Sequence, residues 1–296
     1  MSTWLVTGAT GNVGSAALRV LKASNPEQHL AALVRDADRA RRLVPSAVEL
    51  RVADYNDRKA LATAFNGVTR LLWIASDGAG PDVVRHHANV LGAALEAGVK
   101  HIVFTSIVDI DPSSAFYFTP VYRAAEHELA ACGRSLTVLR CGLYADFLFE
   151  HWIAPALTSG VLAVPAGDAS VAPVCRDDVA QAAAGALSAQ EPPQGMYWLT
   201  GSRAYTFAQI AERASRIHCA PLRYEPMSPG DYLAQCWATL HDPWPHAFSS
   251  LFASIREGRY AAVSDDIQVL LGRRAIALEA LLKSRIARRR ITAGDS

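Results

Sequence analysis

The chain opens with three glycines spaced as a phosphate-holding turn, Gly8, Gly11 and Gly14. They follow a short apolar run and precede a helical stretch. In such a turn the first glycine allows the tight bend, the second lets the backbone approach the phosphates, and the third lets the helix pack closely. The positive end of the helix then faces the phosphates. We therefore predict a dinucleotide pyrophosphate site formed by Gly8, Thr10, Gly11, Asn12, Val13 and Gly14.

The residue that ends the next apolar run indicates which dinucleotide binds. A dinucleotide without a 2′-phosphate needs a carboxylate at this place, whereas a phosphorylated ribose needs a cation. Here the run ends at Arg35, whose planar guanidinium suits a 2′-phosphate. Asp36 either serves the ribose or, as we favour, caps a helix that begins at Ala37. We predict NADP(H), with a simple surface role for Arg35 as the alternative.

Further polar residues follow the later apolar runs. Asp54 comes directly after the third run and is placed for the adenine edge, with capping of its turn as the alternative. Tyr55 follows it and is also expected to bind the cofactor. Ligands bind at the carboxyl ends of the strands in open parallel sheets. The residues that end the fourth and fifth runs should therefore flank the nicotinamide ribose: Ile74, Ala75, Ser76 and Thr105.

The elements that position these residues alternate along the first half of the chain. Apolar runs bounded by turn residues predict strands, and amphipathic stretches between them predict helices. Strands are predicted at 29–35, 47–53, 70–75, 101–106 and 135–140, and helices near 12–23, 37–44, 57–66, 82–98 and 120–132. This order predicts an α/β fold with a doubly wound parallel sheet of the Rossmann type.

The regular alternation of predicted strands and helices ends in the second half of the chain. We expect a dinucleotide-binding core over 1–145 and a smaller, mostly helical, substrate-facing lobe over 146–296 that returns a strand near 197–200 to the same body. The segment at 160–167 is rich in Gly and Pro. The basic stretch Lys283–Arg290 is expected to be a solvated helix end, with contact to an acidic partner as the alternative.

Composition favours small-molecule chemistry. The 296 residues carry a formal net charge of +1, so no overall field favours nucleic acid, and 51% are hydrophobic, which argues against disorder. Five scattered cysteines form no disulfide framework or zinc pattern, and we predict no metal site. His86 and His87 are expected on a solvated helix face. With no signal peptide or membrane span recognised, a cytoplasmic location is expected, and a homodimer is left open.

The motifs together resemble a known family. The turn at 7–14, Arg35, the Asp-Tyr-Asn at 54–56 and the segment 174–180 resemble the atypical short-chain dehydrogenase/reductases of the NmrA-like group. Within that group the chain is most similar to the branch of NADPH-dependent quinone oxidoreductases and triphenylmethane reductases. The resemblance covers nearly the whole chain, and it implies NADP(H) binding and reduction of a quinone-like or dye-like acceptor.

The helix near 120–132 departs from the usual short-chain reductase pattern. Those enzymes place a Tyr and a Lys four residues apart, and the Lys lowers the pKa of the Tyr. Here Tyr122 is followed by Glu126, whose charge would raise a phenol pKa. Tyr122 is the candidate proton donor, with a packing role as the alternative. Glu126, on the same helix face, is expected to bond backbone groups near the nicotinamide.

Quinones accept hydride readily, so the protein needs mainly to orient and stack the acceptor and to exclude water. Aromatic residues follow the sixth predicted strand directly and are expected to contact the substrate: Tyr144, Phe147 and Trp152. We predict an NADPH-dependent oxidoreductase with a flat conjugated acceptor such as a quinone. The alternatives are a non-catalytic NADP(H) sensor and a reductase of a specific carbonyl, imine or aromatic-ether metabolite.

Overall fold

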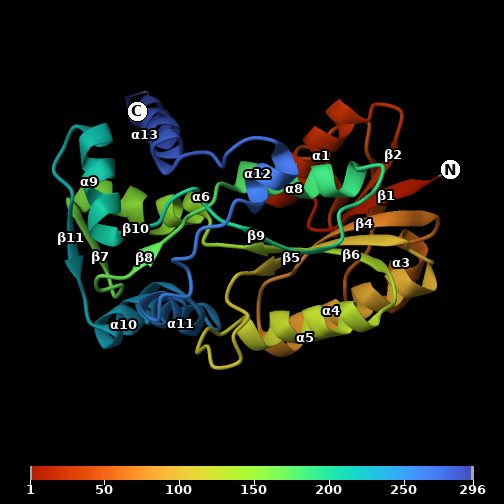
Figure 1. Ribbon diagram of the computed structural model, residues 1–296, viewed down its shortest axis with the longest axis horizontal. Helices are drawn as coiled ribbons and strands as arrows, with labels where there is room; N and C mark the ends of the chain where they lie inside the picture. Colours follow the sequence, from red (N-terminus) through yellow and green to blue (C-terminus); the bar gives the residue numbers. More distant parts are fainter. Residues whose placement is uncertain (1, 295–296) are drawn as a thin grey trace. The chain divides into compact units, whose positions relative to one another are not determined.

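The computed structural model describes residues 2–294, and its main feature is a seven-stranded parallel sheet flanked by helices. The strand order is β3-β2-β1-β4-β5-β6-β9 (Figure 1). Their bounds are β3 Glu49–Val52, β2 His29–Val34, β1 Thr3–Val6, β4 Val68–Ile74, β5 His101–Ile107, β6 Ser135–Cys141 and β9 Gly195–Leu199. The order reverses direction at β1, so the chain winds both ways from that strand. This confirms the predicted doubly wound fold.

Helices cover both faces of the sheet. Figure 1 shows α1 (Asn12–Ser24) and α8 (Arg176–Ser188) on one side, with α3 (Arg58–Ala64), α4 (Gly80–Glu96) and α5 (Thr119–Ala131) on the other. The central strands are therefore apolar on both faces, and Leu5, Leu71 and Ile102 are fully buried. The short α2 (Ala37–Ala40) is N-capped by Asp36, whose carboxylate accepts from the Arg39 N–H. The predicted cap is thus confirmed.

Two compact units make up the described chain. One contains most of the first 140 residues together with Asp177–Tyr197, and the other contains Asp111–Thr119, Cys141–Arg176 and the chain from Trp198 on. The second unit is mostly helical: α6 Ala145–Leu148, the π-helix η1 Phe149–Ile153, α7 Ala154–Ser159, α9 Phe207–His218, α10 Pro229–Thr239, α11 Trp244–Arg256, α12 Asp266–Leu271 and α13 Leu278–Gly294.

Four short strands complete the second unit. β7 (Val161–Val164) pairs in parallel with β11 (Arg223–Pro226), and β8 (Ser170–Val171) pairs with β10 (Tyr205–Thr206). The sequence indicated only a Gly/Pro-rich segment at 160–167, and the strand over residues 161–164 was not predicted. The partner of β7 is β11, which lies about 60 residues further along the chain. A pairing over that distance leaves no local pattern in the sequence.

The basic helix α13 is bound to its own unit. Arg285 forms an ion pair with the buried carboxylate of Asp146 at 2.5 Å, and Arg289 donates to the hydroxyl of Thr158 at 2.8 Å. The expectation of a solvated basic end was wrong for the half-buried Arg285, whereas Arg289 is exposed as expected. Asp146 also accepts from the backbone N–H of Arg176 at 2.8 Å, so one carboxylate joins α6, α8 and α13.

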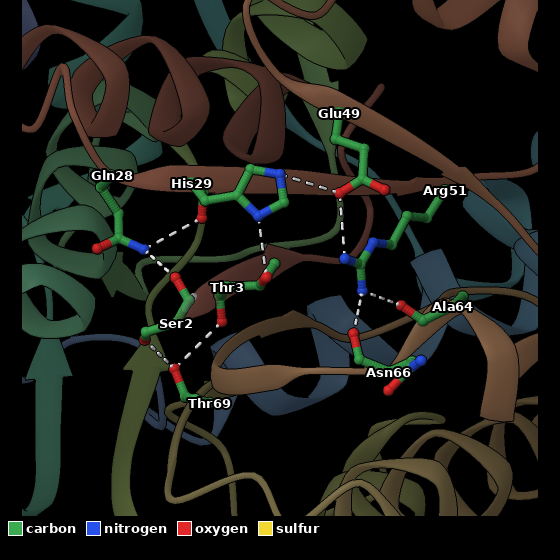
Figure 2. Close-up of polar contacts among 9 residues, drawn as sticks. All are labelled: Ser2, Thr3, Gln28, His29, Glu49, Arg51, Ala64, Asn66 and Thr69. Atoms are coloured by element: carbon green, nitrogen blue, oxygen red, sulfur yellow. Dashed lines mark hydrogen bonds and ion pairs between the residues drawn. The ribbon is translucent and has the colours of Figure 1, made fainter.

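A polar network ties together the amino ends of four strands in the first unit (Figure 2). The ring of His29 contacts the Thr3 hydroxyl at 3.0 Å and the Glu49 carboxylate at 3.3 Å. Arg51 then bonds Glu49 at 3.1 Å and reaches the carbonyls of Ala64 and Asn66, both at 2.8 Å. This network lies at the amino ends of the strands. The ligand is predicted at the opposite, carboxyl ends.

Candidate functional site

The glycine turn has the backbone geometry that only glycine adopts easily. Gly8 lies at φ +58°, and its carbonyl accepts the Gly11 N–H at 2.9 Å. A Cβ on Gly14 would lie 2.3 Å from the Gly8 oxygen, and one on Gly11 would lie 3.2 Å from it. The requirement for Gly14 therefore comes from its closeness to the turn itself, whereas the sequence argument attributed it to helix packing on the sheet.

The amino end of α1 suits a pair of phosphates. The helix is capped by Gly11, which has no side chain to accept the first N–H groups, and no acidic residue occupies the first turn. The backbone donors of Asn12, Val13 and Gly14 therefore lack helical acceptors. Free donors at a helix N-terminus bind phosphate. These residues thus fit the pyrophosphate of a dinucleotide.

Tyr55 braces this turn. Burial raises the pKa of its phenol, and the neighbouring Thr7 side chain and Gly8 backbone lower it in part. The Thr7 hydroxyl in turn accepts the Ile74 N–H at 3.0 Å and donates to the Ile74 carbonyl at 3.3 Å. The Tyr55 phenol, at the end of β3, therefore lies beside the turn that follows β1, and Thr7 joins that turn to the end of β4.

Arg35 and Asp54 lie within electrostatic reach of each other. Arg35 is exposed at the end of β2. The pKa of Asp54 is lowered, first by a hydrogen bond from the Asn56 N–H and then, among smaller causes, by the charge of Arg35. One Asp54 oxygen accepts both the Asn56 N–H at 2.7 Å and the Asn56 side-chain amide at 2.9 Å. Asp54 thus has the turn-capping role that the sequence left open, beside an exposed arginine.

The ends of β4 and β5 are joined by side chains. The Ala75 N–H donates to the Thr105 hydroxyl at 3.2 Å. The Ser76 hydroxyl contacts Nδ1 of His86 at 3.3 Å, and the His86 ring packs edge-on against Tyr55 at 5.6 Å between centroids. Sequence reasoning placed His86 on a solvated face and so missed it as a neighbour of these predicted residues. No local pattern could have shown that contact.

Tyr122 packs within an aromatic cluster of the first unit. Its ring lies 6.3 Å from Phe104 and 6.2 Å from His87, and both of these pack edge-on against Trp73. His87 is 3% exposed, so the expectation of a solvated face was wrong for this residue. The surroundings of Tyr122 match the packing alternative, while its role as a proton donor stays a prediction.

Glu126 has charged and hydroxyl partners. Its carboxylate accepts from Arg140 at 2.6 and 3.1 Å and from the Ser106 hydroxyl at 2.6 Å. These described partners are side chains and not the backbone groups that the sequence analysis expected. Arg140 also offsets the negative charge that stands in the place of the usual lysine. Sequence spacing could not reveal this pair, which joins α5 to β6.

The predicted substrate contacts lie in the second unit. Phe147 and Trp152 pack edge-on at 5.4 Å, and both contact Phe248. Trp152 is buried and donates to the Tyr232 hydroxyl at 2.9 Å, whereas Phe147 is half-buried. The guanidinium of Arg176 lies 5.8 Å from the ring centre of Tyr144. The substrate role of the three residues stays a prediction.

Comparison with known proteins identifies the family of the chain and finds similar oxidoreductases. Residues 8–190 match the NAD(P)H-binding family. The chain is 35% identical to quinone oxidoreductase 2 of Escherichia coli over 77% of its own length and 79% of the relative. The structure of that protein with NADPH superposes with a TM-score of 0.87, covering 95% of this chain and 99% of the other at 30% identity.

One further structure supports the resemblance inferred from the motifs, and another shares the fold. Triphenylmethane reductase from Citrobacter sp. superposes with a TM-score of 0.88 at 29% identity, covering 96% of this chain and 99% of the other. An NmrA structure superposes with a TM-score of 0.78 over 99% and 97% of the two chains, and at 17% identity it shows the shared fold alone. Within the described residues no helix is long and apolar enough to cross a bilayer.

Proposed function

Since the chain belongs to the NAD(P)H-binding family and is an NADPH-dependent oxidoreductase, we propose that it passes hydride to a flat, conjugated small molecule such as a quinone. The observation that carries the proposal is similarity over nearly the whole chain to one reductase of quinones and one of triphenylmethane dyes. Both acceptor classes are conjugated and electron-poor. Bound NADPH would supply the hydride.

The residues of the chain support this acceptor class over a simple ketone. Reduction of a ketone needs a proton donor of suitable pKa, and Tyr122 has Glu126 where a lysine would assist it. An electron-poor ring accepts hydride with less help from a protein acid. The remaining tasks are binding of the phosphates at the glycine turn, orientation of the nicotinamide at the ends of β4 and β5, and stacking of the acceptor.

The reductase names of the relatives favour catalysis over the sensor alternative. The test is steady-state oxidation of NADPH with a panel of benzoquinones, naphthoquinones, triphenylmethane dyes and simple ketones. We expect turnover with the quinones or dyes and little with the ketones. Tight NADPH binding with no turnover across the panel would overturn the proposal in favour of a sensor. Turnover of ketones alone would move it to a carbonyl reductase.

A further inference from the structure

We propose that Glu126 and Arg140 form a positioning pair that holds the Ser106 hydroxyl and thereby fixes the carboxyl end of β5 for the nicotinamide half of NADPH. The inference rests on the cofactor placement in the proposed function, and it does not depend on which acceptor is reduced. Neither residue is assigned contact with the reacting atoms. Their effect is transmitted through Ser106.

The contacts come from three elements that meet at one point. Glu126 projects from α5, Arg140 from β6, and Ser106 from β5. The carboxylate accepts from two guanidinium nitrogens at 2.6 and 3.1 Å, a two-point contact that fixes its orientation. The same oxygen that takes the longer of these bonds accepts the Ser106 hydroxyl at 2.6 Å. The side chain of Ser106 is therefore held from the side of α5.

From Ser106 the constraint passes directly to the predicted cofactor edge. Thr105 precedes it on β5, and successive strand side chains point to opposite faces. Fixing Ser106 on one face therefore sets the backbone that carries Thr105 on the other. The Thr105 hydroxyl accepts the Ala75 N–H at 3.2 Å, which joins the ends of β4 and β5. Thr105 and Ala75 are the two residues of this contact, and both are predicted to flank the nicotinamide ribose.

The burial of the pair argues for a specific role. The side chains of Arg140 and Glu126 are 15% and 10% exposed. Desolvation of two charges opposes folding, so a buried ion pair is a weak source of stability compared with apolar residues of equal volume. Its advantage is directional, because a planar fork on a carboxylate allows few arrangements. Such a pair suits a site that must hold a hydroxyl in one place.

The test compares two ligands that differ in their nicotinamide half. Dissociation constants are measured by titration calorimetry for NADPH and for adenosine 2′,5′-bisphosphate, which lacks the nicotinamide end. In Glu126→Gln and in Ser106→Ala we expect NADPH to bind about tenfold more weakly, the effect of losing about 1.4 kcal/mol. Binding of the bisphosphate should stay within twofold of wild type, since the adenosine half contacts other strand ends.

The matched control is Ser135→Ala. The Ser135 hydroxyl contacts Nδ1 of His101 at 2.8 Å, so it links β6 to β5 at the opposite end of the same two strands. We expect both ligands to bind this variant as they bind wild type. If Glu126→Gln fails to fold, Ser106→Ala decides alone, because it leaves the ion pair intact.

The inference is overturned if NADPH binding is unchanged in Ser106→Ala, if both ligands weaken together, or if Ser135→Ala has the same effect as Ser106→Ala. None of these measurements needs an acceptor. A protein that fails to reduce quinones would therefore refute the proposed acceptor and still leave the positioning pair open to this test.

Discussion

Two arginines set the charge near the predicted cofactor residues. Arg35 is exposed at the end of β2 and lowers the pKa of Asp54, which is lowered most by its hydrogen bond from Asn56. Arg140 is half-buried and neutralises Glu126. An exposed guanidinium is available to a ligand phosphate, whereas one held by a carboxylate acts on the protein itself. At the scale of single residues, the partner of each arginine therefore indicates its task.

Arg35→Ala should weaken NADPH binding by about 10- to 100-fold and leave NADH binding nearly unchanged, because a charge-assisted bond to the 2′-phosphate contributes about 1.5 to 3 kcal/mol. Titration calorimetry with both cofactors gives the result. The control is Arg41→Ala, since Arg41 is also exposed and is already paired with Asp38. Equal losses of affinity for both cofactors would mean that Arg35 does not bind the 2′-phosphate.

Tyr122→Phe should lower turnover with a quinone by less than about tenfold, since general acid help reaches ~10²- to 10⁴-fold only where proton transfer limits the rate. The ring contacts with His87 and Phe104 are kept by phenylalanine. Stopped-flow oxidation of NADPH by both proteins measures the effect. A thousandfold loss would instead identify Tyr122 as an essential acid.

At the scale of elements, the glycine turn and α1 are joined by one close approach. Gly14→Ala would place a Cβ 2.3 Å from the Gly8 oxygen, so the turn must move. We expect a loss of about 1 to 3 kcal/mol in unfolding free energy and weaker NADPH binding.

Gly92→Ala in α4 is the control, because its nearest neighbour is 4.0 Å away and alanine favours a helix by about 0.5 to 1 kcal/mol. Urea unfolding and calorimetry should separate the two variants, and equal stabilities would contradict the close approach.

The elements that the sequence predicted well are those with a local signal. The apolar runs that became β1, β2, β4, β5 and β6 supply much of the buried core, and the glycine spacing between an apolar run and a helical stretch predicted the turn. The helix expected at 37–44 ends at Ala40, because a turn and Pro45 follow. The strand β11 was missed, since Arg223–Pro226 carries exposed charges and becomes a strand only through pairing with β7.

Contacts between residues far apart in the sequence were also missed in the candidate site. The contact of Glu126 with Arg140 joins residues 14 apart, and its contact with Ser106 joins residues 20 apart. The contact of His86 with Tyr55 crosses from α4 to the end of β3. No spacing rule connects these residues, because only the winding of the sheet brings them together. The phosphate-binding turn is local and was predicted, whereas its supports come from distant elements.

On the scale of the whole molecule, buried histidines link folding to pH. Burial is the main cause that lowers the pKa of both His87 and His101 to about 4. A histidine in the unfolded chain titrates near 6.5. Between these two values the unfolded state binds more protons than the folded state, so the free energy of unfolding falls as the pH is lowered from about 6.5 toward 4. The protein should therefore lose stability in mild acid.

His87→Phe should remove part of this pH dependence. Both ring nitrogens of His87 are buried without a hydrogen-bond partner among the described residues, and its ring packs edge-on against Trp73 and Phe104. Phenylalanine keeps the ring packing and cannot be protonated. We expect wild type to lose about 1 kcal/mol more than the variant between pH 7.5 and 5.5. Urea unfolding followed by fluorescence at both pH values measures this difference, with the exposed His127→Phe as the control. If His87→Phe and wild type lose the same stability over this range, the acid sensitivity arises elsewhere, and His101 becomes the next histidine to replace.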